Sequence, residues 1–346
     1  MIEVNKIICG DSLEVLKTLP ADSVSCCISS PPYWALRDYG VDGQLGLEAT
    51  FEEYIDKLCT IYDEVKRVLR KDGTCWVNLG DTYSASITGN QGNNKSTLMG
   101  GKKTQIQAGN RAKQINNPIP LKSLCLIPER FAIEMVNRGW ILRNVIIWHK
   151  PNPMPSSAKD RFTVDFEQVF FFTKSKRYFF EPQYEPHISD PSKIRPAQGV
   201  KNVIDKTTGR LCRFKPQEIF FNPLGRNKRC VWTIPTQPFP EAHFATYPEK
   251  LVEPMIEAGC PKFICKKCGT PRKKVYETEF RGDSNKKGAR VLGNHQGQSS
   301  LPPDIGKKDN WKFLGYSDCG CGKEFEPGIV LDPFAAAAQR FTWPLN

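Results

Sequence analysis

The strongest constraint on the fold is a helix signal that lies between two short apolar runs. In residues 51–69, apolar side chains recur with the 3.6-residue period of a helix that buries one face. The runs "SVSCCISS" before it and "TCWVNLGD" after it are typical of strands that are covered on both faces. Strand, helix and strand at this spacing predict an α/β fold with a doubly wound, mostly parallel sheet.

Later segments continue the same alternation. "SLCLIPERFAIEMVNRGW" predicts a helix and "ILRNVIIWHK" a strand, while "DFEQVFFFTKS" and "RYFFEP" are typical of a hairpin at a sheet edge. Polar insertions divide the chain into five segments. Residues 1–182 form the first half of the α/β domain, 183–235 a polar segment and 236–260 a helical segment. Residues 260–321 form a cysteine-bracketed insertion, and 322–346 the last strand segment.

Charge and cysteine content limit the class of protein. The 346 residues include 49 Lys and Arg against 37 Asp and Glu, a formal net charge of +12. This excess favours a polyanionic partner over a merely solvated basic surface. No apolar run reaches the roughly 18 residues of a membrane span, and the first residues lack the layout of a signal peptide. Thirteen cysteines without such a signal indicate a reducing cytoplasm.

Residues 84–120 interrupt the regular pattern. They are rich in Gly, Asn, Gln, Ser and Lys and contain no Asp or Glu. This composition is typical of a mobile loop. Because all of its charged residues are basic, the segment could equally well be a loop that binds along a nucleic-acid strand. The residues alone leave both interpretations open.

The most informative motif is "ISSPPYW", residues 28–34. It follows a buried strand, at the edge of the sheet where open α/β folds bind ligands. Pro31 and Pro32 favour a rigid, extended turn, with Ser30 before it and Tyr33 after it. An ordinary proline-rich turn followed by core aromatics would have the same sequence, so this alternative stays open. A ligand of a WW domain is excluded, because it needs Pro-Pro-x-Tyr.

Four motifs, in a consistent order, resemble the permuted (beta) group of DNA amino-methyltransferases. They are "CGDSLEVLKTLPADSVSCCISSPPYW", "GWILRNVIIWHKPNPMPSS" with "FEQVFFFTKSKRYFF", "HFATYPEKLVEPMIEAGCP" and "GIVLDPF". The resemblance spans nearly the whole chain. It implies a circularly permuted, Rossmann-like methyltransferase sheet with basic insertions and S-adenosylmethionine as cofactor. It also implies double-stranded DNA as substrate, a cognate restriction endonuclease as partner, and the cytoplasm of a prokaryotic or phage host cell. It leaves the oligomeric state and the recognition sequence open.

The resemblance also implies residue roles. The catalytic turn is Ser30, Pro31, Pro32 and Tyr33, and the cofactor is held by Asp11, Phe244, Thr246, Asp332 and Phe334. Asp11 would meet the adenine end of the cofactor, and the others its ring and methionine ends. Two ordinary alternatives stay open. Asp11 can cap a helix that starts at Ser12, and Asp332 can be a turn residue.

The chemistry of an exocyclic amine suits this motif. The lone pair of such an amine is delocalised into the base, so catalysis must hold the amine and accept its hydrogen bonds. Ser30 and the Pro31 carbonyl can accept them, and Tyr33 can stack on a base extruded from the duplex. The chain contains no Pro-Cys dipeptide, which argues against the carbon-5 cytosine mechanism. The resemblance also implies cytosine N4 as the target, because in this family the residue before Pro-Pro-Tyr is usually aspartate in enzymes for adenine N6 and is serine here. Adenine N6, and a DNA-binding remnant without catalysis, stay open as alternatives.

Cysteines cluster at two places near the C-terminal end of the sequence. "CPKFICKKCG" contains Cys265 and Cys268, and "DCGCGK" contains Cys319 and Cys321. Cys-x-x-Cys followed by glycine resembles a zinc knuckle, so these four residues are candidate ligands of a structural zinc ion. Free surface thiols are the alternative. Segments 183–230 and 270–318 are the candidates for reading the DNA sequence, because they carry Lys, Arg, Asn and Gln.

The closing stretch "LDPFAAAAQRFTWPLN" departs from the family pattern. The resemblance implies a turn that continues Ala-Gly-Ser-Gly-Thr-Thr, then a helix and a strand that ends in an acidic residue for the ribose. Four alanines stand here instead. The resemblance therefore implies a sheet that is incomplete at the C-terminus and a cofactor site that is only half built, and it leaves open whether this chain is active or inactive.

We predict that the residues after Phe334 result from a frameshift. Deleting one G from GCC GGC AGC GGC ACA ACG T leaves GCC GCA GCG GCA CAA CGT, which encodes the run Ala335 to Arg340. Sequencing the gene should reveal codons that one inserted base converts into a glycine-rich turn. Codons that no single insertion converts would leave an unusual natural terminus as the explanation.

Overall fold

The structure is a computed structural model that describes residues 4–36, 43–84, 119–188, 202–204, 211–213, 222, 224–237, 247–278, 290–292 and 311–335. The chain forms two compact units. Unit 1 comprises Met1–Phe180, Cys230–Cys260 and Pro327–Asn346, and unit 2 comprises Glu181–Arg229 and Pro261–Glu326. Residues 85–118, most of the predicted basic loop, lie outside the described residues.

Unit 1 is built on a six-stranded sheet with the order β15-β1-β2-β4-β3-β9. The strands are β1 (Val24–Ser29), β2 (Leu69–Leu79), β3 (Ile141–His149), β4 (Phe166–Thr173), β9 (Val231–Thr233) and β15 (Val330–Leu331). β1 pairs in parallel with both β15 and β2, and β3 pairs in parallel with β9. β4 is antiparallel to its two neighbours. Five strands of this sheet thus run in one direction, which confirms the predicted mostly parallel α/β sheet.

The predicted edge hairpin is wrong in its position. β4 lies between β2 and β3, and residues 177–180 form no strand. The physical reason is visible in the run of aromatics in β4. Phe171 stacks on Trp76 with ring centroids 4.0 Å apart, while Phe170 and Phe172 pack against Phe131 on the other face. An uninterrupted apolar run indicates burial on both faces, which favours an interior strand.

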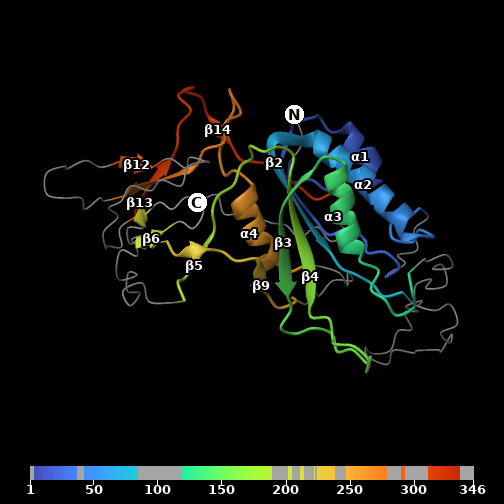
Figure 1. Cartoon of the computed structure of the whole chain (residues 1–346). Helices are drawn as coiled ribbons and strands as arrows, with labels where there is room; N and C mark the ends of the chain where they lie inside the picture. The colour runs from blue at the N-terminus through green and yellow to red at the C-terminus, as the bar shows by residue number, and fades with distance from the viewer. Residues whose placement is uncertain are drawn as a thin grey trace. The chain divides into compact units, whose positions relative to one another are not determined.

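Helices cover both faces of this sheet (Figure 1). α1 (Ser12–Thr18), α2 (Phe51–Val68) and α3 (Ile127–Asn137) share one apolar core with the sheet residues Cys27, Val77 and Phe172. α4 (Glu249–Gly259) packs on the opposite face with Cys26, Trp76 and Phe171. Neighbouring residues of one strand therefore belong to different cores, as the two-residue period of a strand requires.

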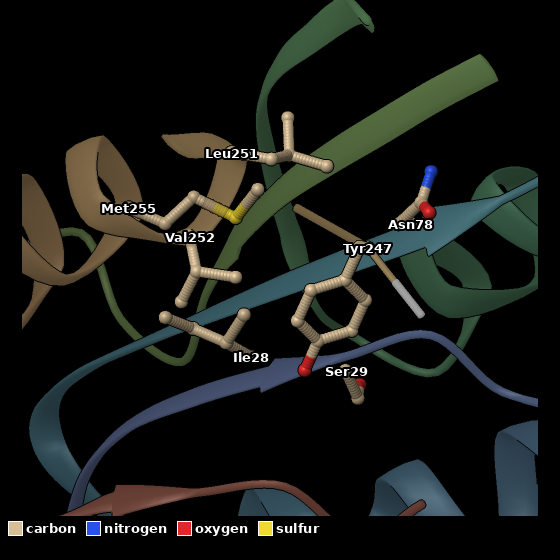
Figure 2. Close-up of a pocket in the computed structure, with 7 residues that line it drawn as sticks. All are labelled: Ile28, Ser29, Asn78, Tyr247, Leu251, Val252 and Met255. Atoms are coloured by element: carbon tan, nitrogen blue, oxygen red, sulfur yellow. The ribbon is translucent and has the colours of Figure 1, made fainter. Parts of the chain in front are cut away.

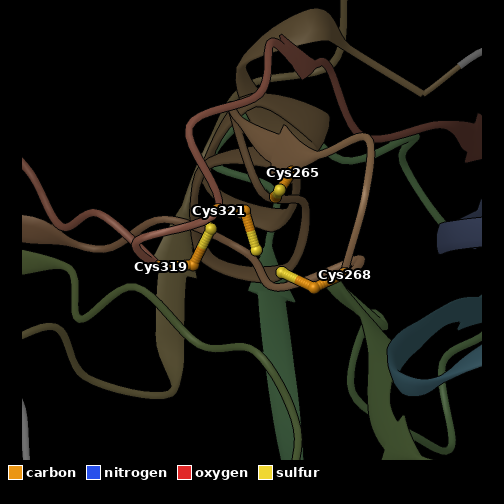
Figure 3. Close-up of side chains that lie close together, drawn as sticks. All are labelled: Cys265, Cys268, Cys319 and Cys321. Atoms are coloured by element: carbon orange, nitrogen blue, oxygen red, sulfur yellow. The ribbon is translucent and has the colours of Figure 1, made fainter.

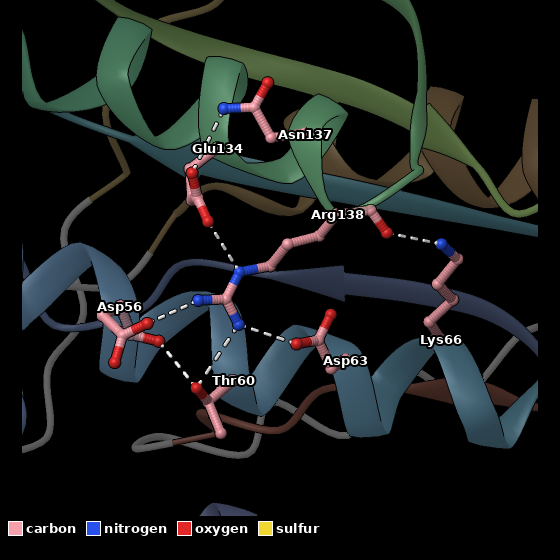
Figure 4. Close-up of polar contacts among 7 residues, drawn as sticks. All are labelled: Asp56, Thr60, Asp63, Lys66, Glu134, Asn137 and Arg138. Atoms are coloured by element: carbon pink, nitrogen blue, oxygen red, sulfur yellow. Dashed lines mark hydrogen bonds and ion pairs between the residues drawn. The ribbon is translucent and has the colours of Figure 1, made fainter.

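An ion-pair network joins α3 to α2 (Figure 4). Arg138, the residue after α3, pairs with Asp63 at 2.7 Å, with Asp56 at 2.5 Å and with Glu134 at 2.9 Å. Lys66 donates to the carbonyl of Arg138 at 2.9 Å. The Arg138 side chain is 21% exposed, while Asp63 and Asp56 are 44% and 73% exposed, so water screens the pair with Asp56 more than the pair with Asp63. The network helps to fix the two helices that support the sheet.

Unit 2 contains small antiparallel sheets. A three-stranded sheet has the order β12-β11-β13, and β10 pairs with β14, β5 with β8, and β6 with β7. These strands are β5 (Tyr184–Glu185), β6 (Asn202–Ile204), β7 (Leu211–Arg213), β8 (Arg226–Asn227), β10 (Ile264–Cys265), β11 (Lys274–Thr278), β12 (Arg290–Leu292), β13 (Trp311–Tyr316) and β14 (Phe325–Glu326). Among the residues described in both units, no helix has the length and apolar character that crossing a bilayer requires.

Candidate active site

The turn that leaves β1 is held by α2 and by the segment before it. Tyr62 of α2 hydrogen-bonds the Oγ of Ser29 at 2.8 Å, at the last position of β1. Tyr54 of α2 donates to the carbonyl of Pro32 at 2.9 Å. Gly46 has a φ of +96°, and a Cβ added to it would lie only 2.9 Å from the carbonyl oxygen of Tyr33. The Ser-Pro-Pro-Tyr turn is therefore packed on both sides and has little freedom to move.

A hydrogen-bond network continues from the turn across the sheet. Tyr33 donates its hydroxyl proton to Oε2 of Glu167 at 2.8 Å and lies 3.2 Å from Oδ1 of Asn78. Ser30 donates a longer hydrogen bond to the Tyr33 hydroxyl, at 3.5 Å. Burial, together with the charge of Glu167, raises the pKa of Tyr33 well above its usual value. Tyr33 is thus held in its protonated form, with its hydroxyl fixed by a carboxylate.

Glu167 is itself held by a lysine. Lys150, directly after β3, pairs with Oε1 of Glu167, and the two side chains are 18% and 19% exposed. Because β4 runs antiparallel to β3, its first residues meet the last residues of β3, and Trp148 lies opposite Glu167. Sequence reasoning missed Lys150, Glu167 and Asn78. A usable signal for Glu167 was a lone acidic residue at the start of an otherwise apolar strand.

The second part of the site follows β15. The register pairs Cys27 with Leu331, so Asp332 comes next to Ile28, just before the Ser-Pro-Pro-Tyr turn. Asp332 accepts hydrogen bonds from the Tyr247 hydroxyl at 2.8 Å and from the backbone N–H of Phe334 at 2.9 Å. Burial raises the pKa of Asp332 to about 6. Tyr247 was missed, although it directly precedes the proline that caps α4.

The other predicted cofactor residues have mixed outcomes. Asp11 caps α1 by accepting from the N–H of Glu14 at 3.1 Å, which is the helix-capping role that the sequence left open beside cofactor binding. The adjacent Ser12 donates to the carbonyl of Pro333 at 2.6 Å, which ties α1 to the segment after β15. Phe334 packs on Tyr62 with centroids 6.2 Å apart. Phe244 and Thr246 lie outside the described residues, as do the residues after Ala335, so these predictions stay predictions.

A narrow pocket lies at the ends of β1 and β2, against α4 (Figure 2). Its apolar wall comes from α4 and β1, and its polar groups come from the strand ends and from Tyr247. The lining residues are Ile28, Ser29, Asn78, Tyr247, Leu251, Val252 and Met255. Its empty volume of about 180 Å³ is smaller than the roughly 300–1,000 Å³ of a ligand pocket, so it is a crevice beside Tyr247 and not a fully formed cofactor cavity. The Tyr247 hydroxyl that points to Asp332 connects this pocket to the segment after β15.

Comparison with known proteins identifies the family. The DNA methylase family of N6/N4 enzymes matches residues 24–263. The chain belongs to this family. Its members are S-adenosylmethionine-dependent DNA methyltransferases, which confirms the resemblance found in the sequence.

Several relatives are similar over most of their length. The Type II methyltransferase M.XycI of Xanthomonas campestris pv. cyanopsidis is 40% identical over 254 residues, which are 72% of this chain and 71% of the relative. M.Cfr9I of Citrobacter freundii is 39% identical over 250 residues, 72% and 71% of the two chains. Among solved structures, the PvuII DNA methyltransferase (cytosine-N4-specific) has a TM-score of 0.42 at 20% identity, covering 73% of this chain and 70% of that one.

The residues present fit the cofactor of the methylase family. Asp332 is a carboxylate whose raised pKa indicates that its charge is incompletely compensated. A ligand with cationic groups would compensate it. Tyr247 adds a hydroxyl beside the same carboxylate, and Phe334, whose backbone N–H donates to Asp332, places an aromatic ring against Tyr62. S-adenosylmethionine has an ammonium group, a sulfonium and an adenine ring, and so offers a matching set of groups.

Unit 2 holds the four cysteines that were predicted as metal ligands (Figure 3). The Sγ atoms of Cys265, Cys268, Cys319 and Cys321 all lie within 4.8 Å of one another. Segments that are about fifty residues apart in the sequence therefore place their thiols together, as the spacing predicted. No disulfide joins any cysteine whose side chain is described.

We predict that Asp332 makes the stability of the protein depend on pH. Its folded pKa of about 6 lies above the ordinary 3.8, so the folded state keeps a proton that the unfolded state releases. Its contribution to stability is complete below about pH 4 and is lost as the pH rises to about 6, by roughly 3 kcal/mol. Chemical denaturation of Asp332→Asn and wild type should give unfolding free energies whose difference changes by this amount between pH 4 and 7.

The exposed Glu52 on α2 provides a matched control. Glu52→Gln removes one exposed carboxylate and serves as the control for the loss of a single negative charge. If the unfolding free energies of Asp332→Asn and wild type changed in parallel between pH 4 and 7, Asp332 would not titrate in this range. Its negative charge would then be fully compensated in the folded state.

Proposed function

We propose that the chain transfers a methyl group from S-adenosylmethionine to the exocyclic N4 of cytosine in duplex DNA, after the target base is extruded. The observation that carries the proposal is the Ser-Pro-Pro-Tyr turn at the end of β1, beside the pocket and Asp332. The Type II names of the relatives support a bacterial restriction–modification setting. We accordingly expect a cytoplasmic enzyme with a cognate endonuclease.

When bound, S-adenosylmethionine supplies the methyl group. We assign its binding to Asp332, Tyr247 and Phe334, with Asp11, Phe244 and Thr246 as further contacts that the family resemblance implies. Asp332 would accept from a cationic group, and the apolar wall of α4 would exclude water from the pocket. The four clustered cysteines of unit 2 have no part in this chemistry.

The target amine needs two hydrogen-bond acceptors, since its lone pair must be drawn out of conjugation with the base. We assign these roles to the Oγ of Ser30 and the carbonyl of Pro31. The neighbouring carbonyl of Pro32 already accepts from Tyr54, which favours Pro31 for the substrate. Pro32 keeps both acceptors on one rigid turn. The Tyr33 ring would then stack on the extruded base.

The network behind the turn determines how the hydroxyl of Ser30 is used. Lys150 pairs with Oε1 of Glu167, which leaves Oε2 as the acceptor that faces the Tyr33 hydroxyl. Tyr33 therefore gives its single proton to Glu167, and its oxygen is left to accept from Ser30. With its proton directed at Tyr33, Ser30 presents lone pairs to the amine. Glu167 is thus a positioning residue that acts through Tyr33.

Methylation of DNA in living cells tests the proposal directly. Plasmid from cells that express the chain should contain N4-methylcytosine when its nucleosides are separated by mass spectrometry. Ser30→Ala should lower the rate of methyl transfer by about 10²- to 10³-fold, because the amine loses an acceptor, and should leave DNA retention on a gel unchanged.

The other outcomes distinguish the alternatives. N6-methyladenine in place of N4-methylcytosine would assign the enzyme to adenine. Unmodified DNA that is still bound by the protein would indicate a DNA-binding remnant and would contradict the enzyme.

A double-mutant cycle tests the role of Glu167. The amide of Glu167→Gln can donate to the Tyr33 oxygen, which turns the tyrosine proton toward Ser30. We expect Glu167→Gln and Tyr33→Phe each to lower kcat by about 10- to 100-fold, with little change in cofactor affinity, and the double variant to lose no more than the worse single one. Glu52→Gln serves as the control. Losses that multiply would mean that the two residues act independently.

A further inference from the structure

Four thiols of unit 2 converge on one point. Their Sγ atoms are all within 4.8 Å of one another, and Cys265 is buried while the other three are at least partly exposed (Figure 3). A tetrahedral zinc ion with Zn–S bonds of about 2.3 Å sets its ligand sulfurs about 3.8 Å apart. The thiols therefore need to move by less than about 1 Å to share one ion.

Both segments that carry the cysteines form tight backbone turns, which bring the ligands of each pair close together. The N–H of Gly269 donates to the carbonyl of Cys265 at 2.8 Å, which closes a tight turn around Cys268. Gly269 has a φ of +69°, and Gly320 and Gly322, on either side of Cys321, have φ values of +73° and +60°. Residues with a Cβ rarely adopt this conformation. Each pair of cysteines thus sits on a turn that glycine permits.

We propose that Cys265, Cys268, Cys319 and Cys321 bind one structural zinc ion. Thiolate sulfur is a preferred zinc ligand, and four protein ligands leave no open position for catalysis. Four thiolates and one zinc ion carry a net charge of −2. The segment 262–273 offsets this charge with basic residues, namely Lys262, Lys266, Lys267, Arg272 and Lys273.

The ion joins the two ends of an insertion. The chain leaves the cluster after Cys268, forms β11, β12 and β13, and returns at Cys319. β10, which carries Cys265, pairs with β14, which follows Cys321. Arg272 reinforces this base by donating to the carbonyls of Tyr316 and Ser317 at 2.8 and 2.5 Å and by lying over the Phe325 ring at 4.4 Å.

Beside the contacts of Arg272, the strand pairing at the base is short. β10 and β14 are two residues long, which is short for an independent hairpin. The ion pair between Lys266 and Glu324 is exposed and contributes little. Closing a loop of about fifty residues costs chain entropy that one metal site can offset. Zinc therefore acts as a cross-link at the base of this three-stranded sheet.

Metal content tests the proposal without any assay of activity. Wild-type protein, purified without added metal and dialysed, should contain about one zinc per chain by plasma mass spectrometry. Cys265→Ser and Cys321→Ser should lose it. Cys230→Ser, which changes an exposed cysteine of unit 1, should keep it.

A second measurement needs no variant and so does not depend on the folding of the serine mutants. Titrating wild type with an organic mercurial should release zinc, detected with a chromogenic chelator, as four thiols react. Protein that carries less than about a tenth of a zinc per chain, that holds iron, or that has these cysteines in disulfides would overturn the proposal.

Discussion

The parallel pairing of β1 with β15 and β2 is the constraint on which the site depends. The backbone N–H groups of Ser25 and Cys26 both donate to the carbonyl of Ile329, at 2.9 and 3.1 Å, and so hold the last described strand beside the first. Parallel neighbours end at the same edge of a sheet. Residues that lie about three hundred positions apart in the sequence, Ser30 and Asp332, therefore reach the same edge.

The antiparallel strand β4 adds what parallel strands alone do not supply. Its first residues, not its last, lie at the edge where β2 and β3 end. Glu167 can thus meet Tyr33 from the next strand but one, while Lys150 reaches it from the end of β3. In the proposed mechanism this carboxylate orients the hydroxyl groups without touching the substrate. The turn proposed for catalysis and the residues proposed to position it therefore come from different parts of the sheet.

The two units contain different candidate sites. Unit 1 holds the methyltransferase sheet and the residues proposed for catalysis and cofactor binding, while unit 2 holds the four thiols and small antiparallel sheets. The small sheets of unit 2 have short strands, and the proposed zinc ion would add stabilisation there, as metal sites do in small domains with a limited apolar core. Unit 1 is stabilised by its buried apolar core, and the proposed zinc ion would cross-link the four thiols of unit 2.

Local patterns in the sequence determined the mostly parallel sheet, the helices around it, the Ser-Pro-Pro-Tyr turn and the four cysteines, because periodicity, prolines and Cys-x-x-Cys spacing act over a few residues. The position of β4 inside the sheet, the partners Lys150, Glu167 and Asn78, and the contact of Tyr247 with Asp332 were decided only by the tertiary structure. Strand order and side-chain partners depend on packing between distant segments. A single sequence can mark an unusual residue such as Glu167 at a strand end, but it does not show which distant residue that side chain contacts, whereas the folded sheet fixes the contact through register and burial.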